Sequence, residues 1–105
     1  MNAFKKIKKI HFVGIGGAGM IGIARVLLQK GYKISGSDIT ISADLNKLRN
    51  EGAKVYQGHS KSNLKDVDLL VLSSAIHKSN SEVLKAKELG ITTIPRAEML
   101  GSIMR

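Results

Sequence analysis

Residues 11–20 read HFVGIGGAGM, in which three glycines follow a short apolar run with the spacing G-x-G-x-x-G. Gly14 permits a tight turn after a strand, Gly16 lets the main chain approach a phosphate, and Gly19 lets the following helix pack closely on the strand. The first amides of such a helix have no partner inside the helix and can bind an anion. The stretch therefore predicts a strand, a loop that holds a pyrophosphate, and a helix.

Short β-rich runs alternate with helical segments along the rest of the chain. Right-handed crossovers between parallel strands make the order 3-2-1-4-5 the simplest arrangement. The sequence thus predicts one α/β domain over residues 1–105, with a Rossmann-like parallel sheet and helices on both faces. Strands are predicted at residues 10–13, 32–34, 54–57, 67–72 and 91–94.

Helices are predicted between these strands. The first covers residues 18–30, and its apolar side chains spread around most of the circumference. This favours a helix wedged between the sheet and neighbouring helices over one that packs on a domain not present here. Ser42 is expected to cap the second helix. Ser79 and Glu82 have capping-box spacing and are expected to open a helix that ends at Gly90.

The composition limits the classes of partner. The chain has no cysteine, which excludes a thiol nucleophile or a zinc-thiolate site, and its three histidines are too scattered to predict a metal site. A net charge of +9 favours anionic ligands, but the lysines lack interleaved aromatic residues, so no nucleic-acid partner is expected. The apolar stretch 10–24 contains five glycines and is shorter than the ~20 residues of a membrane span. A cytoplasmic protein without membrane contact is therefore expected.

Polar residues after other strands add to the candidate site. Asp38 lies 19 residues beyond the loop, where NAD enzymes carry the acid that holds the ribose. Ser73 and Ser74 end the fourth strand, where they either bind a ligand or only cap a loop. His59 and His77 follow strands on the same side and are weaker candidates. From these residues alone, an NAD-binding Rossmann domain of a dehydrogenase or regulatory protein remains possible.

Four segments, HFVGIGGAGM, ISGSD, VLSSAI and PRAEML, in this order and spacing resemble the N-terminal domain of the Mur ligase family. The match is to its UDP-N-acetylmuramate–L-alanine ligases, ATP-dependent amide-forming enzymes of peptidoglycan biosynthesis that serve cell wall biogenesis, cell shape and cell division. In this family the N-terminal domain holds the UDP part of the substrate. The resemblance therefore implies UDP-N-acetylmuramate, rather than NAD, as the ligand of the glycine loop.

The resemblance also implies roles for individual residues, without any catalytic residue in this domain. The loop, which begins at Gly14, would hold the diphosphate through the backbone of Gly16, Gly17, Ala18 and Gly19. Ser37 and Asp38 would face the uridine, and Ser73 and Ser74 would line the nucleotide crevice.

The ATP site of such a ligase should follow RAEML as a loop of the form G-T-H-G-K-T. No segment of the form G-x-x-x-x-G-K-[ST] occurs in the 105 residues. The resemblance implies ATP and Mg²⁺ for the whole enzyme, but no cofactor in this domain. We expect the ATP-binding and C-terminal ligase domains to be absent from this chain, which would bind substrate without catalysing the reaction.

Overall fold

Strands and helices alternate as the sequence predicts. The computed structural model describes residues 7–103. The strands are β1 (Lys9–Val13), β2 (Lys33–Asp38), β3 (Lys54–Gln57), β4 (Leu69–Leu72) and β5 (Thr92–Pro95). The helices are α1 (Met20–Gln29), α2 (Ala43–Asn50), α3 (Ser81–Leu89) and α4 (Arg96–Ile103), with a short 3₁₀ helix η2 (Lys61–Leu64) between β3 and β4.

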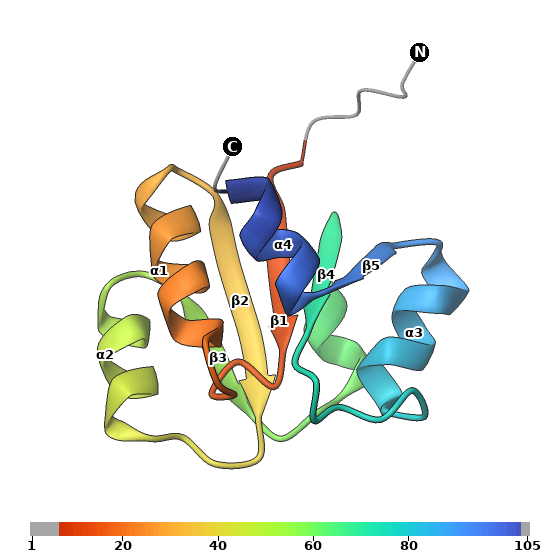
Figure 1. Ribbon diagram of the computed structural model, residues 1–105. Coiled ribbons are helices and arrows are strands. Elements are labelled where there is room, and N and C mark those ends of the chain that lie inside the picture. The colour runs from red at the N-terminus through yellow and green to blue at the C-terminus, as the bar shows by residue number, and fades with distance from the viewer. Residues whose placement is uncertain (1–6, 104–105) are drawn as a thin grey trace.

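The strands form one parallel sheet in the order β3-β2-β1-β4-β5 (Figure 1). In the central strand, His11 lies opposite Ser35 of β2 and Leu70 of β4. The chain order reverses between β1 and β4, which is where α/β sheets of this kind bind their ligands. The predicted α/β, Rossmann-like architecture and its strand order are confirmed.

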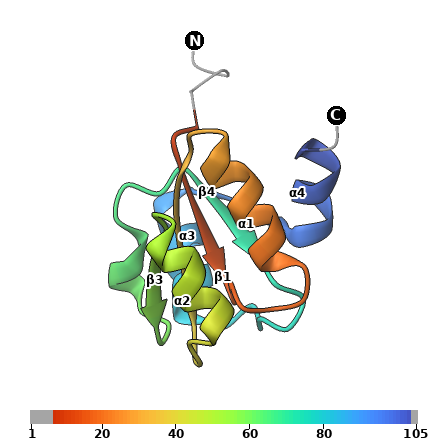
Figure 2. The ribbon, with the colours of Figure 1, turned by 90° about the vertical axis from the view of Figure 1, so that its left-hand side faces the viewer.

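Helices cover both faces of the sheet (Figure 2). On one face, α1, α2 and α4 enclose a buried apolar cluster that includes Phe12, Leu45 and Met99. On the other face, α3 and η2 contribute Ala86 and Leu64 to a smaller buried cluster. Strand β1 is therefore covered on both sides, as expected for the centre of a parallel sheet. Within residues 7–103, no helix is both long and apolar enough to cross a membrane.

Helix α1 begins two residues later than predicted. Gly19 adopts the left-handed conformation with φ of +74°, so the helix starts at Met20 rather than Ala18. Ile23 and Leu27 are buried in the larger cluster, and the helix contacts both α2 and α4. The prediction of a helix wedged between the sheet and its neighbours is confirmed.

The capping-box prediction for α3 is wrong. Asn80, not Ser79, caps the helix, and its side-chain oxygen accepts a hydrogen bond from the amide of Glu82 at 2.8 Å. The side chain of Glu82 does not return to the cap, because it is completely buried against the sheet. The other two predicted boundaries are confirmed: Gly90 ends α3, and the Ser42 hydroxyl caps α2.

Candidate functional site

The glycine loop after β1 is a tight turn held by its own backbone. The amides of Gly14 and Ile15 both donate to the carbonyl oxygen of Ser37, at 2.8 and 3.0 Å. The amide of Gly17 donates to the carbonyl oxygen of Gly14 at 2.8 Å. The loop is therefore tied to the end of β2, and these three amides already have partners.

Asp38, the last residue of β2, accepts a hydrogen bond from the amide of Gly16. Its Oδ2 atom accepts this amide at 2.9 Å, and its Oδ1 atom accepts the amide of Thr40 at 3.4 Å. A Cβ atom on Gly16 would lie 3.0 Å from Oδ2 and 3.2 Å from Cδ1 of Leu45. The second glycine of the motif therefore allows a close contact between the loop and a carboxylate of its own chain.

Ala18 and Gly19 carry the open amides of the loop. Both residues are exposed, and neither amide donates to another residue within the described range 7–103. They directly precede α1, whose N-terminal end carries the positive part of the helix dipole. Of the four residues predicted to hold a diphosphate, these two have backbone donors available.

A guanidinium group lies beside these amides. A Cβ atom on Gly19 would stand 3.0 Å from Nη1 of Arg96, the first residue of α4. Arg96 is half-buried, and its guanidinium makes no ion pair or hydrogen bond within residues 7–103. A cation next to a helix N-terminus is electrostatically unfavourable unless an anion lies close to both. The loop end is therefore a strongly positive region.

A groove of about 500 Å³ runs past the loop at the carboxyl end of the sheet. It is bordered by Gly14 after β1, Asp38 at the end of β2, His59 after β3, and Ser73 and His77 after β4. Segments far apart in the sequence thus meet at the switch point, as predicted. Gly16 and Gly17 also line this groove.

The predicted serines occupy different positions around the groove. Ser73 is 7% exposed and lies under the loop, because a Cβ atom on Gly17 would be 2.6 Å from its Oγ atom. Ser74 is exposed and is not among the residues that line the groove. Ser37 is completely buried, so its side chain lies beneath the groove rather than in its wall.

A buried polar cluster lies directly below the groove. Both Glu82 and His11 are completely buried, and His11 Nε2 donates to Glu82 Oε1 at 2.8 Å. The Ser37 hydroxyl donates to the same oxygen at 2.7 Å. The other oxygen, Oε2, accepts Asn63 Nδ2 at 2.7 Å and the amide of Ser60 at 3.0 Å. A carboxylate without solvent contact thus receives four hydrogen bonds, which compensates for its burial.

These contacts determine the charge of the carboxyl group. Burial of Glu82 raises its pKa, but hydrogen bonds from His11, Ser37 and Ser60, together with attraction to His11, outweigh burial and lower the pKa from 4.5 to about 2. Glu82 is therefore ionised at neutral pH and accepts hydrogen bonds only.

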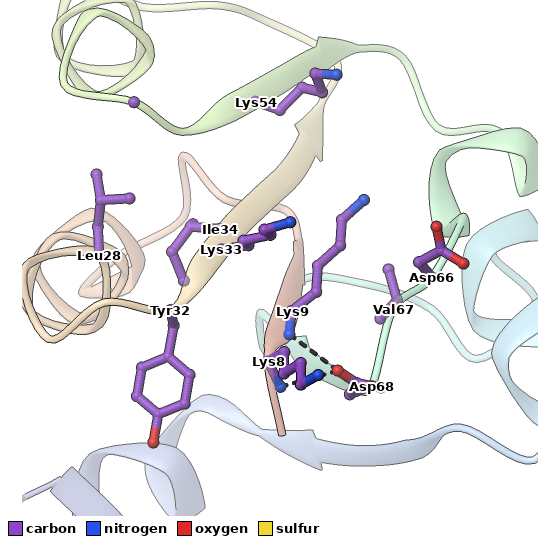
Figure 3. A pocket seen from close by; sticks show the side chains of 11 residues that line it. Lys8, Lys9, Leu28, Tyr32, Lys33, Ile34, Lys54, Asp66, Val67 and Asp68 are labelled. Atoms are coloured by element: carbon purple, nitrogen blue, oxygen red, sulfur yellow. Dashed lines mark hydrogen bonds between the residues drawn. The ribbon is translucent and has the colours of Figure 1, made fainter. Parts of the chain in front are cut away.

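A second hollow, of about 750 Å³, lies at the opposite end of the sheet (Figure 3). Lys8, Lys9, Lys33 and Lys54 surround it at the amino ends of β1, β2 and β3. Asp68 also lies in its wall and accepts the amides of Lys8 and Lys9 at 2.9 and 3.0 Å. Acidic and basic groups are mixed here, and its lining within residues 7–103 includes no glycine loop and no helix N-terminus. The groove at the carboxyl ends is therefore the candidate site.

Three features of the site escaped the sequence interpretation. The sequence predicts Glu82 only as part of a helix cap, and it does not predict Arg96 or Ile39 as site residues. Ile39 is 71% exposed and lies in the groove wall directly after Asp38. An apolar residue between two polar ones, Asp38 and Thr40, is a sequence signal for such a position, whereas nothing in the sequence pairs Glu82 with His11.

Comparisons with known proteins agree with this geometry. Residues 9–105 match the family model described as "Mur ligase family, catalytic domain". A UDP-N-acetylmuramate–L-alanine ligase from Sulfurihydrogenibium is 57% identical over 100 residues, which cover 95% of this chain and 22% of that protein. The crystal structure of the corresponding ligase MurC from Thermotoga maritima superposes with a TM-score of 0.88 at 30% identity, covering 94% of this chain and 23% of that one.

A related ligase (MPL) from Neisseria meningitides has a TM-score of 0.76 at 28% identity, covering 86% of this chain and 29% of that chain. The chain thus spans about a fifth of the length of the curated relatives that it matches. The family match extends from the first residue of β1 to the end of the sequence, and it includes the glycine loop and the whole groove. The chain belongs to the Mur ligase family.

Proposed function

We propose that this chain is the UDP-N-acetylmuramate-binding part of an ATP-dependent ligase that joins L-alanine to this substrate in peptidoglycan biosynthesis. The observation that carries the proposal is the pair of open amides at Ala18 and Gly19, which lie beside Arg96 at the entrance of α1. Relatives named as such ligases, at more than half identity over nearly the whole chain, support the substrate. Nucleotide-linked sugars are cytoplasmic metabolites, so we place the protein in the cytoplasm.

The diphosphate is assigned to the positive end of the loop. Backbone amides at a helix N-terminus bind phosphate oxygens well, and a guanidinium group can donate two hydrogen bonds to one phosphate. In this proposal Ala18 and Gly19 donate from the backbone and Arg96 from its side chain. Gly16 and Gly17 contribute by holding the loop in shape, since their amides are bonded to Asp38 and Gly14.

The nucleoside is assigned to the groove beside the loop. Ile39 offers an exposed apolar surface on which a base can pack, and His59 and Ser73 line the same groove with polar atoms. Asp38 lines the groove and is bonded to Gly16 of the loop. Ser37 acts from beneath, His77 lines the groove, and the exposed Ser74 follows Ser73 directly. The muramyl end would extend toward the remaining domains of the ligase, which are the proposed protein partners.

NAD is the competing ligand, because the same loop geometry accepts either diphosphate. In NAD enzymes the acid at the end of β2 holds the adenosine ribose. Here Oδ2 of Asp38 already accepts the Gly16 amide at 2.9 Å, so this carboxylate also has a structural role in the loop. Each carboxylate oxygen can accept a second hydrogen bond, so it is the names of the relatives, rather than Asp38, that favour the UDP-sugar over NAD.

ATP and Mg²⁺ do not fit the residues of this chain. No lysine-bearing phosphate loop occurs in the sequence, and within residues 7–103 no three acidic or histidine side chains are grouped to hold a metal ion. We therefore assign the phosphoryl-transfer and amide-forming steps to other domains of the ligase. The role proposed for this chain is to bind and orient the nucleotide end of the substrate.

An amide chemical-shift titration of the ¹⁵N-labelled chain tests the proposal. We expect saturable shifts at Ala18, Gly19 and Asp38 with UDP-N-acetylmuramate. The amide of Lys54, at the opposite end of the sheet, should not shift. NAD, titrated separately at the same concentrations, should leave these signals in place. Saturable shifts of the loop with NAD but not with the UDP-sugar would contradict the proposal.

A further inference from the structure

One histidine in the groove wall is connected to the buried polar cluster. His59 Nδ1 lies 2.8 Å from Ser37 Oγ, and its side chain is 18% exposed. Ser37 Oγ in turn lies 2.7 Å from Glu82 Oε1. A chain of two hydrogen bonds therefore leads from a buried carboxylate to the surface of the proposed nucleotide site.

The position of each proton in this chain follows from the donors available. Glu82 is ionised, so the Ser37 hydroxyl must donate its single hydrogen to the carboxylate. Ser37 Oγ can then only accept from His59. The hydrogen of the neutral imidazole is therefore on Nδ1, and Nε2 carries a lone pair.

The second nitrogen of His59 faces the open side. Nε2 has no hydrogen-bond partner within residues 7–103, and in that range every buried side-chain nitrogen or oxygen has one. Nε2 is therefore accessible to solvent at the groove, which His59 lines. It presents a hydrogen-bond acceptor to whatever lies there.

We propose that Glu82 and Ser37 are positioning residues that hold His59 in the Nδ1–H tautomer, so that its Nε2 atom accepts a hydrogen bond from the nucleoside of the ligand. The group that donates is a base imide N–H or a ribose hydroxyl. This inference rests on the proposed function for the identity of the ligand. It also gives a reason why a small domain buries a carboxylate completely. The carboxylate takes the hydrogen of Ser37, and the hydrogen bond that one ring nitrogen of a histidine makes decides which nitrogen carries the proton.

Ser35 provides a matched control for Ser37. Both serines lie on β2, both are completely buried, and both hydroxyls contact a histidine. Ser35 Oγ lies 2.7 Å from His11 Nδ1 and has no contact with His59. Ser35→Ala and Ser37→Ala thus remove the same atom at similar depth, but only the second interrupts the hydrogen-bonded connection to His59. Glu82 Oε2 lies 4.0 Å from His59 Nδ1, beyond hydrogen-bond distance, and does not replace that connection.

The tautomers can be measured in the ligand-free chain by long-range ¹H–¹⁵N correlation of the histidine rings at pH 8. We expect the Nδ1–H form for His59 in the wild type and in Ser35→Ala, and a mixture of forms in Ser37→Ala. His77 provides an internal reference, because the amide of Ser79 donates to its Nδ1 atom at 3.1 Å, which requires the opposite tautomer. An Nε2–H or doubly protonated His59 in the wild type would overturn the inference without any variant.

Binding measurements then test the role of the acceptor. Ser37→Ala should lower the affinity for UDP about fivefold, the contribution of one neutral hydrogen bond, while Ser35→Ala should leave the affinity unchanged. In the wild type, loss of affinity with N3-methyl-UDP identifies the imide as the donor, and loss with 2′-deoxy-UDP or 3′-deoxy-UDP identifies a ribose hydroxyl. Full affinity for all three analogues, or equal effects of the two serine variants, would overturn the inference.

The two proposals fail in different ways. Absence of UDP binding by the wild-type chain would contradict the proposed function. Normal UDP binding together with an unchanged His59 tautomer in Ser37→Ala would contradict only the positioning role.

Discussion

The carboxylate of Asp38 accepts the amide of Gly16 at 2.9 Å, which joins the end of β2 to the middle of the glycine loop. The residue that the sequence places at a ligand's ribose therefore holds the loop itself. This contact fixes the direction of the loop before any ligand arrives. A preformed loop loses less conformational entropy when the ligand binds.

We expect Gly16→Ala to weaken both the loop and ligand binding. The new Cβ atom would lie 3.0 Å from Asp38 Oδ2, so the carboxylate must move by a few tenths of an ångström and its hydrogen bond to the Gly16 amide is weakened. Weakening of this charge-assisted hydrogen bond should reduce the free energy of unfolding by about 1 kcal/mol and the affinity for UDP-N-acetylmuramate about fivefold. Urea unfolding and titration calorimetry measure the two effects.

Gly22→Ala is the control for this substitution. Gly22 lies in α1, and a Cβ atom there would meet nothing within 4 Å. Alanine should increase the free energy of unfolding by about 0.5–1 kcal/mol, because glycine is a poor helix former, and should leave the affinity unchanged. If Gly16→Ala binds as tightly as Gly22→Ala, the loop contact has no role in binding.

Arg96→Gln should lower the affinity for UDP-N-acetylmuramate about tenfold and reduce its dependence on salt. The substitution removes the guanidinium beside Gly19 while keeping an uncharged, shorter polar side chain. Calorimetry at several salt concentrations measures both quantities. Arg25→Gln, which removes only a part-exposed ion pair with Glu51, should change neither. Equal effects of the two substitutions would indicate a general charge effect rather than a phosphate contact.

Ile39→Ser should reduce the affinity for UDP about fivefold without changing stability. Ile39 is 71% exposed, so the folded protein loses little burial when it is replaced. A base that covers about 40 Å² of its surface would gain about 1 kcal/mol. Leu89→Ser, at an exposed position on α3 away from the groove, provides the comparison. Unchanged UDP binding by Ile39→Ser would exclude apolar packing at this position.

Glu82→Gln should change the dependence of stability on pH. The pKa of Glu82 is lowered in the folded chain from 4.5 to about 2, so its stabilising contribution is complete above pH 4.5 and is lost as the pH falls toward 2. That difference corresponds to roughly 3 kcal/mol at 1.36 kcal/mol for each pH unit. The wild type should therefore lose its advantage over Glu82→Gln in urea unfolding between pH 4.5 and 2.

Glu88→Gln on the same helix is the control for this pH dependence. Glu88 is exposed and pairs with Lys85 at the surface, which lowers its pKa, but solvent screens such a pair, so its substitution should change the pH dependence far less than Glu82→Gln does. A constant stability difference between wild type and Glu82→Gln from pH 7 to 2.5 would contradict the assignment of an ionised, buried carboxylate.

The sheet and the location of the site could be predicted because they depend on local patterns. Alternation of strand and helix, together with the handedness of crossovers, determines the strand order. The glycine spacing after β1 locates the loop, and the carboxyl ends of neighbouring strands then bring Asp38, His59 and Ser73 together. These features need no knowledge of individual side-chain contacts.

The partners of individual polar groups could not be predicted, because they depend on pairs distant in sequence. Glu82 and His11 are 71 residues apart, and Glu82 matches a helix cap by spacing alone. The side chain of Glu82 is buried with four hydrogen-bond donors instead of bonding to the helix cap. The donors come from the sheet and loops beneath α3, so this outcome depends on tertiary structure. For the same reason, the engaged amides of Gly16 and Gly17 could not be distinguished from the open amides of Ala18 and Gly19.

The polar cluster under α3 also prevents misalignment of the central strands. His11 faces Ser35, and Ser37 lies two positions further along β2 on the same side of the sheet. A slip of β2 by a single residue along β1 would turn both hydroxyls toward the opposite face. The carboxylate of Glu82 would then be buried without the hydrogen bond from Ser37. This would destabilise the slipped pairing by several times RT. The interior charge thus penalises the alternative pairings that a short, aliphatic sheet would otherwise tolerate.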